Sequence, residues 1–357
     1  MTLSDVVRLR LAHQRLTGHP SGSAAVVVSA LGAMQAQDYP SALWAVGVRL
    51  PGAGRADVER AIADGTLVRT WLMRGTLHLV ASADVRWMLA LLGPRIIAGS
   101  AYRLRQLEID DAALERSRDV LREALSSEGT LTRAEIKQRL EAAGVSTEGQ
   151  RAIHILQRMS LEGLVCPAAP KGRQQTFALL DPLVPKGRPM DRDAALAELA
   201  RRYFAGHGPA TLQDLVWWSG LSTADARRGL DLAREHLIEA RVDDAAYWTA
   251  SARPALTHRS ASLFLLPAWD EYVLGYADRS LALDTDAARR GVARGGLFHP
   301  AIAVGGSVIG RWDPGTVTRA SAVHTLFRAL DAPESRRLDE ALCAYDRFAT
   351  GRASTLR

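Results

Sequence analysis

Two glutamines stand two positions apart in residues 34–38, just after an apolar run typical of a helix (24–33). Pro40 follows, so the helix is expected to end at these polar residues or just before them. In an extended segment, side chains two positions apart share a face. An amide both donates and accepts hydrogen bonds, so Gln35 and Gln37 could together hold a water molecule and a sugar or base without carrying charge. The alternative is structural: Gln35 caps the helix and Gln37 is solvated.

The composition is that of a folded, basic protein. The chain has 357 residues, of which 47% are hydrophobic and 24% charged, and its formal net charge is +6. A positive balance suits a polyanionic partner such as nucleic acid. Only three of the 45 basic residues are lysines: Lys137, Lys171 and Lys186. Schiff-base chemistry needs a lysine or a terminal amine in the site, so it is not expected here.

The cysteines and the apolar runs bear on cofactors and compartment. Cys166 and Cys343 lie far apart and have no partners at metal-ligand spacing, so we expect no disulfide framework, no metal and no other cofactor. No apolar run approaches the roughly 18 residues of a membrane span. The N-terminus lacks the layout of a signal peptide. The expectation is a cytoplasmic, monomeric protein.

One order of elements recurs along the chain: three helices followed by a two-stranded hairpin, which is the order of a winged helix. The second copy also contains a capping box, formed by Thr132 and Glu135. The pattern predicts an α+β fold, mainly helical, with three tandem winged-helix units and a C-terminal β-rich, barrel-like unit. The predicted boundaries are 1–100, 101–185 and 186–258 for the three winged-helix units, and 259–357 for the β-rich unit with its closing helix.

The predicted hairpins place polar side chains at defined positions. Arg74, Thr76 and His78 alternate after the turn of the first hairpin, so they are expected on one face of its second strand. The basic loop 171–173 of the second copy looks like a wing. In the β-rich unit, residues 300–312 form a strong two-residue hairpin, which either enters a DNA groove as a wedge or is an ordinary barrel hairpin.

Residues 34–38, 74–80 and 266–280 together resemble the AlkZ/YcaQ family of bacterial DNA glycosylases, which are built from tandem winged helices and a barrel-like C-terminal part. The resemblance spans nearly the whole chain. The catalytic motif of the family is Gln-x-Gln in the AlkZ branch and Gln-x-Asp in the YcaQ branch. Gln35 and Gln37 match the first and depart from the second. The resemblance therefore implies that both glutamines are catalytic.

The family also implies a reaction, the excision of N7-alkylated purines. Some members unhook interstrand crosslinks or confer self-resistance to alkylating natural products. An N7-alkylated purine is positively charged, so it leaves C1′ as a neutral base with little general-acid help. The protein has to hold a water beneath C1′ and stabilise an oxocarbenium-like transition state. The expected enzyme is a monofunctional, metal-independent DNA glycosylase for bulky adducts in double-stranded DNA, and its product is an abasic site.

Other residues are candidates for support and for DNA binding. Asp38 contributes charge to the site or caps a helix. The resemblance places Arg74, Thr76 and His78 near the cleft as catalytic support; alternatively, they form a hydrogen-bonded cluster behind the motif. Asp270 and Glu271 are expected to be structural, because adjacent strand residues face opposite ways. Candidate DNA contacts are Arg103, Arg105, Lys171, Arg173, Tyr276, Arg279, His299 and Arg311, of which Tyr276 and Arg279 either touch DNA or brace the cleft.

Two rival functions predict different behaviour. A winged-helix transcriptional regulator without catalysis would bind an operator sequence and be indifferent to changes at Gln35 and Gln37. A structural interaction protein would show no salt-dependent affinity for DNA.

Overall fold

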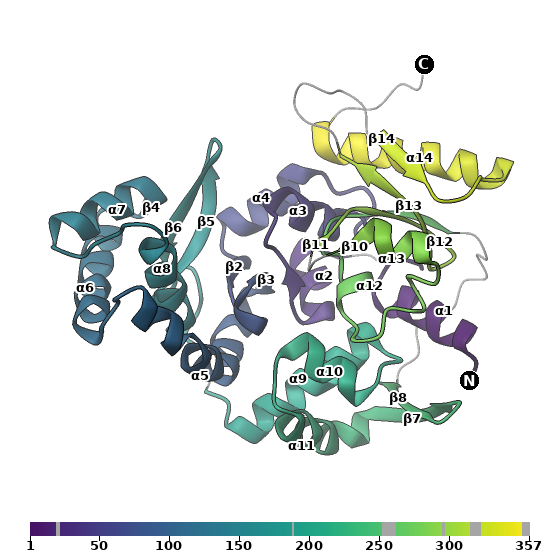
Figure 1. The fold of residues 1–357 in the computed structure, drawn as a ribbon, viewed down its shortest axis with the longest axis horizontal. Coiled ribbons are helices and arrows are strands. Elements are labelled where there is room, and N and C mark those ends of the chain that lie inside the picture. The colour runs from purple at the N-terminus through teal and green to yellow at the C-terminus, as the bar shows by residue number, and fades with distance from the viewer. Residues whose placement is uncertain (19–21, 188, 252–261, 295–296, 315–322, 352–357) are drawn as a thin grey trace. The chain divides into compact units, whose positions relative to one another are not determined.

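The computed structural model describes the chain except residues 19–21, 188, 252–261, 295–296, 315–322 and 352–357 (Figure 1). The fold is α+β and mainly helical, as predicted. It divides into two compact units, the first made of Met1–Val58 and Leu196–Arg357 and the second of Glu59–Ala195. This division follows proximity in space, whereas the predicted boundaries follow the order of elements in the sequence. The predicted boundary at 258/259 falls outside the described residues.

The first unit combines the N-terminal helices with the last part of the chain. Apart from the first residues of α9, its elements are α1 (Leu3–His13), α2 (Ala24–Leu31), β1 (Met34–Gln35), α3 (Tyr39–Gly47), α9 (Arg192–His207), α10 (Leu212–Ser219), α11 (Thr223–Ala233), η2 (Arg234–His236), β7 (Leu237–Val242), β8 (Ala245–Ala250), β9 (Leu263–Leu266), α12 (Glu271–Leu274), α13 (Asp286–Val292), β10 (Ala293–Arg294), β11 (Leu297–Phe298), β12 (Ala301–Val304), β13 (Ser307–Asp313), β14 (Val323–Leu326) and α14 (Ala332–Thr350).

The helix before the glutamine pair ends where the sequence predicts. Ser23 caps the start of α2, and Gly32, in a left-handed conformation with φ 78°, ends it. The sequence does not predict α3. Pro40 reads there only as a stop signal, whereas proline is also favoured in the first turn of a helix, and Pro40 occupies that place in α3.

An antiparallel sheet in the order β14-β13-β12-β9 forms the β-rich part of the first unit. Val304 pairs with Ser307 across a two-residue turn, and both turn residues, Gly305 and Gly306, have positive φ. Such a turn matches the twist of the two strands, and the strand pairing confirms the predicted hairpin. Within the described residues the sheet is open, and the barrel-like closure is not confirmed.

The closing helix α14 covers this sheet with aromatic side chains. The ring of Tyr345 lies 5.1 Å from that of Trp44 and 4.8 Å from that of Trp312, both edge-on. The indole N–H groups of Trp44 and Trp312 donate to the carbonyls of Leu265 and Leu266 in β9. Buried indoles need such partners, so the two tryptophans fix β9, and with it the chain that continues to α12.

The helices predicted for the second winged-helix copy are present in the second unit, in the predicted order. Its elements are α4 (Arg55–Ala63, which spans the unit boundary), β2 (Leu67–Trp71), η1 (Met73–Gly75), β3 (Leu77–Ala81), α5 (Ser82–Gln106), α6 (Asp111–Glu128), β4 (Thr130–Thr132), α7 (Arg133–Ala142), α8 (Arg151–Leu161), β5 (Val165–Lys171) and β6 (Gln174–Leu179). The capping box of Thr132 and Glu135 at the start of α7 is confirmed. The long helix α5 is not predicted.

The core of the second unit joins the first hairpin to the second winged-helix copy. Ile155, Leu156 and Met159 of α8 are fully buried in it. The rings of Trp71 in β2 and Phe177 in β6 stack in the same core, with centroids 6.4 Å apart. Shared apolar burial of this kind binds the two hairpins into one body, which explains why the first hairpin is grouped with the second copy.

Candidate active site

The glutamine pair lies on extended chain between α2 and α3. Met34 and Ala36 are fully buried, Gln35 is 8% exposed and Gln37 is exposed. This alternation is the period of an extended backbone, with the two apolar side chains toward the core and the two amides on the other face. Because Gly32 caps α2, the alternative that Gln35 caps this helix is wrong.

Asp38 acts as a helix cap. Its carboxylate accepts the backbone N–H of Ser41 at 2.9 Å, at the start of α3. A carboxylate at this place satisfies an otherwise unpaired N–H and interacts favourably with the helix dipole. The capping alternative therefore accounts for Asp38.

The side chain of Glu271 binds the backbone of the glutamine motif. One carboxylate oxygen accepts the N–H of Gln35 at 2.9 Å. The other accepts the indole N–H of Trp218 at 3.0 Å and lies 3.2 Å from Nε2 of His207. Glu271 is only 2% exposed, so these hydrogen bonds replace the water that a buried carboxylate has lost.

Asp270, its neighbour, faces a different partner. Arg49 is fully buried and donates to both carboxylate oxygens of Asp270, at 2.7 and 2.8 Å. Its remaining N–H groups donate to the carbonyl of Ala45 and to the backbone and side-chain oxygens of Gln14. All five guanidinium donors are thus satisfied. Both acids have structural partners, as expected, but the expected strand is wrong: Asp270 caps α12 and Glu271 is the first residue of that helix.

A partly buried histidine of the first unit has a lowered pKa. His13 of α1 lies with Nε2 3.1 Å from the hydroxyl of Thr249. Burial, with a smaller contribution from neighbouring His207, lowers the pKa of His13 to about 4. In the unfolded chain this group takes up a proton near pH 6.5.

We expect the free energy of unfolding to fall as the pH drops from about 6.5 to 4, because the unfolded chain then binds a proton that the folded one does not. The contribution of His13 is about 2 to 3 kcal/mol over this range. His13→Gln removes the titration, so the difference in stability between variant and wild type should change with pH by that amount in urea denaturation. A difference that stays constant from pH 7 to 4 would contradict this assignment.

Arg74, Thr76 and His78 belong to the second unit, whereas the glutamines belong to the first. The prediction that they alternate on one strand face is wrong. Arg74 sits in the short helical turn η1 at φ 55°, Thr76 precedes β3, and only His78 lies in the strand. The cause is the turn itself, which is longer than a two-residue connection: the hydroxyl of Thr76 donates to the carbonyl of Met73.

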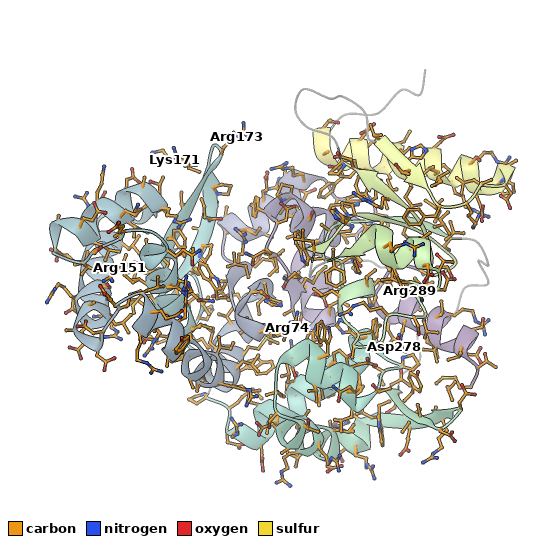
Figure 2. The ribbon with its side chains drawn as sticks, viewed as in Figure 1. Arg74, Arg151, Lys171, Arg173, Asp278 and Arg289 are labelled. Carbon is orange, nitrogen blue, oxygen red and sulfur yellow. The ribbon has the colours of Figure 1, made fainter. Side chains whose placement is uncertain are left out.

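His78 is 1% exposed, and its Nδ1 lies 3.0 Å from the carbonyl of Thr76. The amide of Gln157 donates to the carbonyl of Gly75 at 2.9 Å. These contacts stiffen the turn that presents Arg74, which is labelled in Figure 2. The observed contacts fit the alternative of a hydrogen-bonded cluster.

The candidate DNA contacts of the second unit are all exposed. Lys171 and Arg173 flank Gly172 at the end of the β5–β6 hairpin (Figure 2). Arg103 and Arg105 lie near the end of α5. The guanidinium of Arg103 donates to the side chains of Gln106 and Gln150, so it braces α5 as well.

The candidates of the first unit differ in access. Tyr276 is 2% exposed; its hydroxyl donates to the carbonyl of His207 and accepts from Gln14, and burial raises the pKa of Tyr276. A side chain this deeply buried does not contact DNA directly. The burial of Tyr276 fits the alternative, that it braces the cleft. Arg279 is half-buried between the rings of Trp217 and Phe298, at 4.7 and 5.1 Å, and burial lowers the pKa of its guanidinium.

The turn of the β12–β13 hairpin contacts other parts of the first unit, which fits the alternative of an ordinary hairpin. Gly306 at its turn is buried, and its carbonyl accepts the hydroxyl of Tyr272. A Cβ at this glycine would lie 2.3 Å from Val7 of α1. Gly306 is therefore packed against α1 and Tyr272, whereas Gly305, the other residue of the turn, is exposed. Arg311, in β13, is exposed. Burial, and secondly the charge of Arg311, lower the pKa of His299, which precedes β12.

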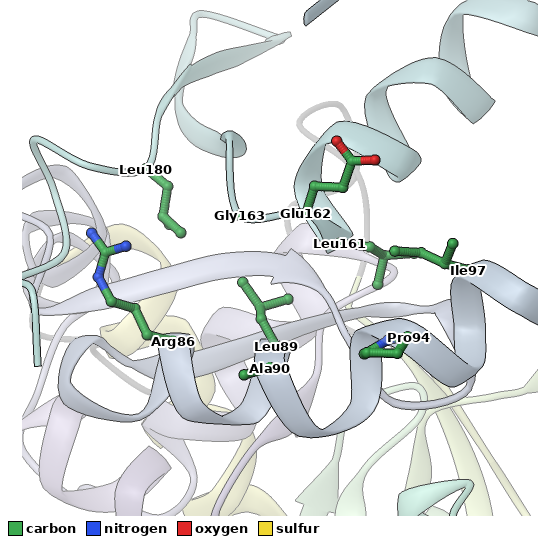
Figure 3. A pocket seen from close by; sticks show the side chains of 9 residues that line it. All are labelled: Arg86, Leu89, Ala90, Pro94, Ile97, Leu161, Glu162, Gly163 and Leu180. Carbon is green, nitrogen blue, oxygen red and sulfur yellow. The ribbon is translucent and has the colours of Figure 1, made fainter. Parts of the chain in front are cut away.

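A pocket of about 330 Å³ lies in the second unit beside α5 (Figure 3). Its lining is mostly apolar, with Leu89, Pro94 and Leu161 among it. The two charged residues that line it are bound to protein groups: Arg86 donates to Asp181, and Glu162 accepts from Arg118 and Arg158. None of the predicted site residues lines this pocket, so it is separate from the candidate active site.

In the part of the chain that the structure describes, no group of three or more His, Cys, Asp or Glu side chains could hold a metal ion. Among the same residues, no helix has the length and apolar character that crossing a membrane requires. Burial raises the pKa of the Cys166 thiol to about 12, so this thiol stays protonated at neutral pH.

The family described as DNA glycosylase AlkZ-like matches residues 28–348. The chain belongs to this family. It is therefore a DNA glycosylase, as the motifs predict. The interstrand DNA cross-link repair glycosylase of Streptomyces sahachiroi is 26% identical in an alignment of 330 positions that covers 87% of this chain and 87% of that protein. The structure of Streptomyces sahachiroi DNA glycosylase AlkZ, 23% identical, covers 99% of this chain and 98% of its own with a TM-score of 0.79, so this AlkZ-like protein shares its fold.

Proposed function

We propose that the protein hydrolyses the N-glycosidic bond of bulky N7-alkylpurine adducts in double-stranded DNA, interstrand crosslinks among them, in DNA repair or in self-resistance to alkylating natural products. The observation that carries this is the extended segment of Gln35 and Gln37, with Met34 and Ala36 buried behind it. The name of the S. sahachiroi relative, an interstrand cross-link repair glycosylase, supports crosslinks as substrates.

In the proposed mechanism, both glutamines bind the water molecule that attacks the sugar. Their amide oxygens accept hydrogen bonds from the water molecule and orient it so that a lone pair of the water oxygen points at C1′. The C1′–N9 bond breaks with its electron pair passing to the purine, which neutralises the charge at N7. The water oxygen then bonds to C1′ and its proton passes to solvent, because an amide is too weak a base to keep it. The product is an abasic sugar.

Strand cleavage is not part of this reaction. It would need an amine that forms a Schiff base with C1′. The three lysines, Lys137, Lys171 and Lys186, all fall in the sequence of the second unit, and the segments of the first unit, which carry the glutamines, contain none. The scarcity of lysines supports a monofunctional enzyme.

We further propose that three winged-helix units, over 1–100, 101–185 and 186–258, bind the duplex, followed by a barrel-like unit over 259–357. The β5–β6 hairpin is the proposed wing. Its loop carries Lys171 and Arg173, both exposed. By contrast, the β7–β8 turn is acidic, with Asp243 and Asp244, and the β12–β13 turn, Gly305 and Gly306, carries no basic side chain. A polyanion favours the basic loop.

Replacing Lys171 and Arg173 together by alanine should weaken duplex binding to the same degree for all sequences. If each contacts one phosphate, the slope of log K against log salt should fall by about 2. The matched control, Arg122→Ala with Arg139→Ala, removes the same charge from exposed sites of the same unit and should leave the slope nearly unchanged. Equal slopes for wing and control variants would exclude the wing as a phosphate contact.

The proposed function is tested by single-turnover excision from a duplex with one N7-methylguanine and from a crosslinked duplex. We expect the wild type to release free base while the strand stays intact until alkali is added. A variant with Gln35→Ala and Gln37→Ala should release none but still bind the duplex. If the wild type releases no base from either substrate yet binds one sequence selectively, the regulator function is correct instead.

A further inference from the structure

Glu271 is a buried acid whose two carboxylate oxygens bind different groups. One oxygen accepts the backbone N–H of Gln35 at 2.9 Å, and the other is held by Trp218 and His207. We propose that Glu271 is a positioning residue, which fixes the backbone of the motif so that the Gln35 amide is correctly placed for the reaction. This inference rests on the proposed catalytic role of Gln35.

The two side chains that hold Glu271, His207 and Trp218, are themselves held by their surroundings. His207 and Trp218 are 0% and 1% exposed. The ring of His207 stacks on that of Tyr203, with centroids 4.8 Å apart, and its carbonyl accepts the hydroxyl of Tyr276 at 2.7 Å. A residue fixed on several sides in a close-packed interior has one position, so the carboxylate presents a rigid acceptor to the motif.

The backbone on either side of Glu271 is constrained as well. Trp269 has φ 55°, which a bulky side chain rarely adopts and which persists only where the surrounding structure imposes it. Asp270 is held by Arg49. After Glu271, a Cβ at Gly275 would lie 2.6 Å from the carbonyl of Glu271 and 2.8 Å from His207. The strained turn and the tight helix α12 together direct Glu271 inward.

The chemistry of the site requires a carboxylate. Gln35 and Trp218 both present N–H donors, one to each oxygen, and a carboxyl group can accept at both oxygens, whereas a side-chain amide has only one oxygen. In Glu271→Gln, the NH₂ group of the new amide must face one of these donors. If the NH₂ group faces Gln35, the hydrogen bond that holds the backbone of the motif is lost. A shift of about 1 Å in a catalytic group can cost about 100-fold in rate.

The test compares Glu271→Gln with Asp214→Asn. Asp214 is 3% exposed and lies in the same unit, but its carboxylate accepts the backbone N–H groups of Thr211 and Ala277, which lie outside the motif. Both variants thus change one buried acid to its amide. Glu271→Asp, which keeps the charge but is too short to reach Gln35, is a second variant should Glu271→Gln not fold.

We expect Glu271→Gln and Glu271→Asp to lower the single-turnover excision rate about tenfold or more, while the dissociation constant for the duplex changes less than about twofold. Hydrogen exchange at the amide of Gln35 should become faster in both. Asp214→Asn should lower the melting temperature and leave both the excision rate and the Gln35 amide close to wild type.

Wild-type excision in the folded Glu271 variants would overturn the inference, and so would an equal loss of rate in Asp214→Asn, which would indicate a merely structural role. The two proposals fail differently. If Gln35→Ala leaves excision unchanged, the proposed function of the glutamines fails. If Gln35→Ala abolishes excision but the Glu271 variants do not affect it, only the positioning role of Glu271 fails.

Discussion

Arg49→Met is expected to lower the free energy of unfolding by about 3 to 5 kcal/mol, because it leaves the buried carboxylate of Asp270 without its charged partner. Arg49 is 0% exposed, and each of its five donors has an acceptor in the folded protein. Urea denaturation followed by circular dichroism measures the loss. Arg139→Met, which breaks the exposed pair with Glu128, should cost less than about 1 kcal/mol.

A double variant separates the cost of the lone charge from the value of the pair. Arg49→Met with Asp270→Leu removes both charges, and it should regain more than half of the stability that Arg49→Met loses. The two changes would then be strongly non-additive, as expected for groups in contact. If Arg49→Met costs no more than the surface control, the pair of Arg49 and Asp270 does not hold the first unit together.

The first unit depends on such pairs because its two segments are far apart in sequence. Gln14 of the N-terminal segment accepts from Arg49 and donates to Tyr276 of the C-terminal segment. Arg10 donates to the carbonyl of Pro209, and its guanidinium lies 3.7 Å from the ring of Tyr276. The glutamine motif belongs to the first segment and Glu271 to the second. The same buried polar contacts that close the unit therefore bring the motif to Glu271.

Local signals predict the repeated elements well. The capping box of Thr132 and Glu135 and the two-residue turn of Gly305 and Gly306 lie where the sequence places them, because helix caps and tight turns depend on neighbouring residues. The helix α3 is missed because Pro40 fits both the end of one helix and the start of the next. Local signals do not predict which elements share a core, because a core forms from residues that are far apart in the sequence.

The site shows the same limit. The glutamine pair is visible in the sequence, and its meaning comes from the resemblance. The contact of Glu271 with Gln35 joins residues 236 positions apart, and the sequence indicates only that adjacent acids face opposite ways. Tyr276 is predicted to be a DNA contact or a brace because it lies in the family-like stretch 266–280. Its burial decides between the two, and burial depends on the whole fold.

Gln37→Ala is expected to lower the single-turnover excision rate by about 100- to 1,000-fold, the size of effect seen when one preorganised hydrogen-bonding group of an active site is removed. Gln37 is exposed, so stability should change by less than about 0.5 kcal/mol. The variant therefore separates chemistry from folding more cleanly than Gln35→Ala, since Gln35 is 8% exposed. Gln138→Ala, at an exposed glutamine of α7, is the matched control and should excise at the wild-type rate.

The conservative variant Gln37→Glu identifies what the amide contributes. If position 37 only accepts hydrogen bonds from the water, a carboxylate can replace it, and its negative charge also favours an oxocarbenium-like transition state. Gln37→Glu should then retain far more activity than Gln37→Ala, with duplex affinity unchanged in both. If Gln37→Glu is as inactive as Gln37→Ala, the amide acts as a donor to substrate instead. If Gln37→Ala excises at the wild-type rate, Gln37 does not hold the water, and the proposed mechanism is wrong at its central step.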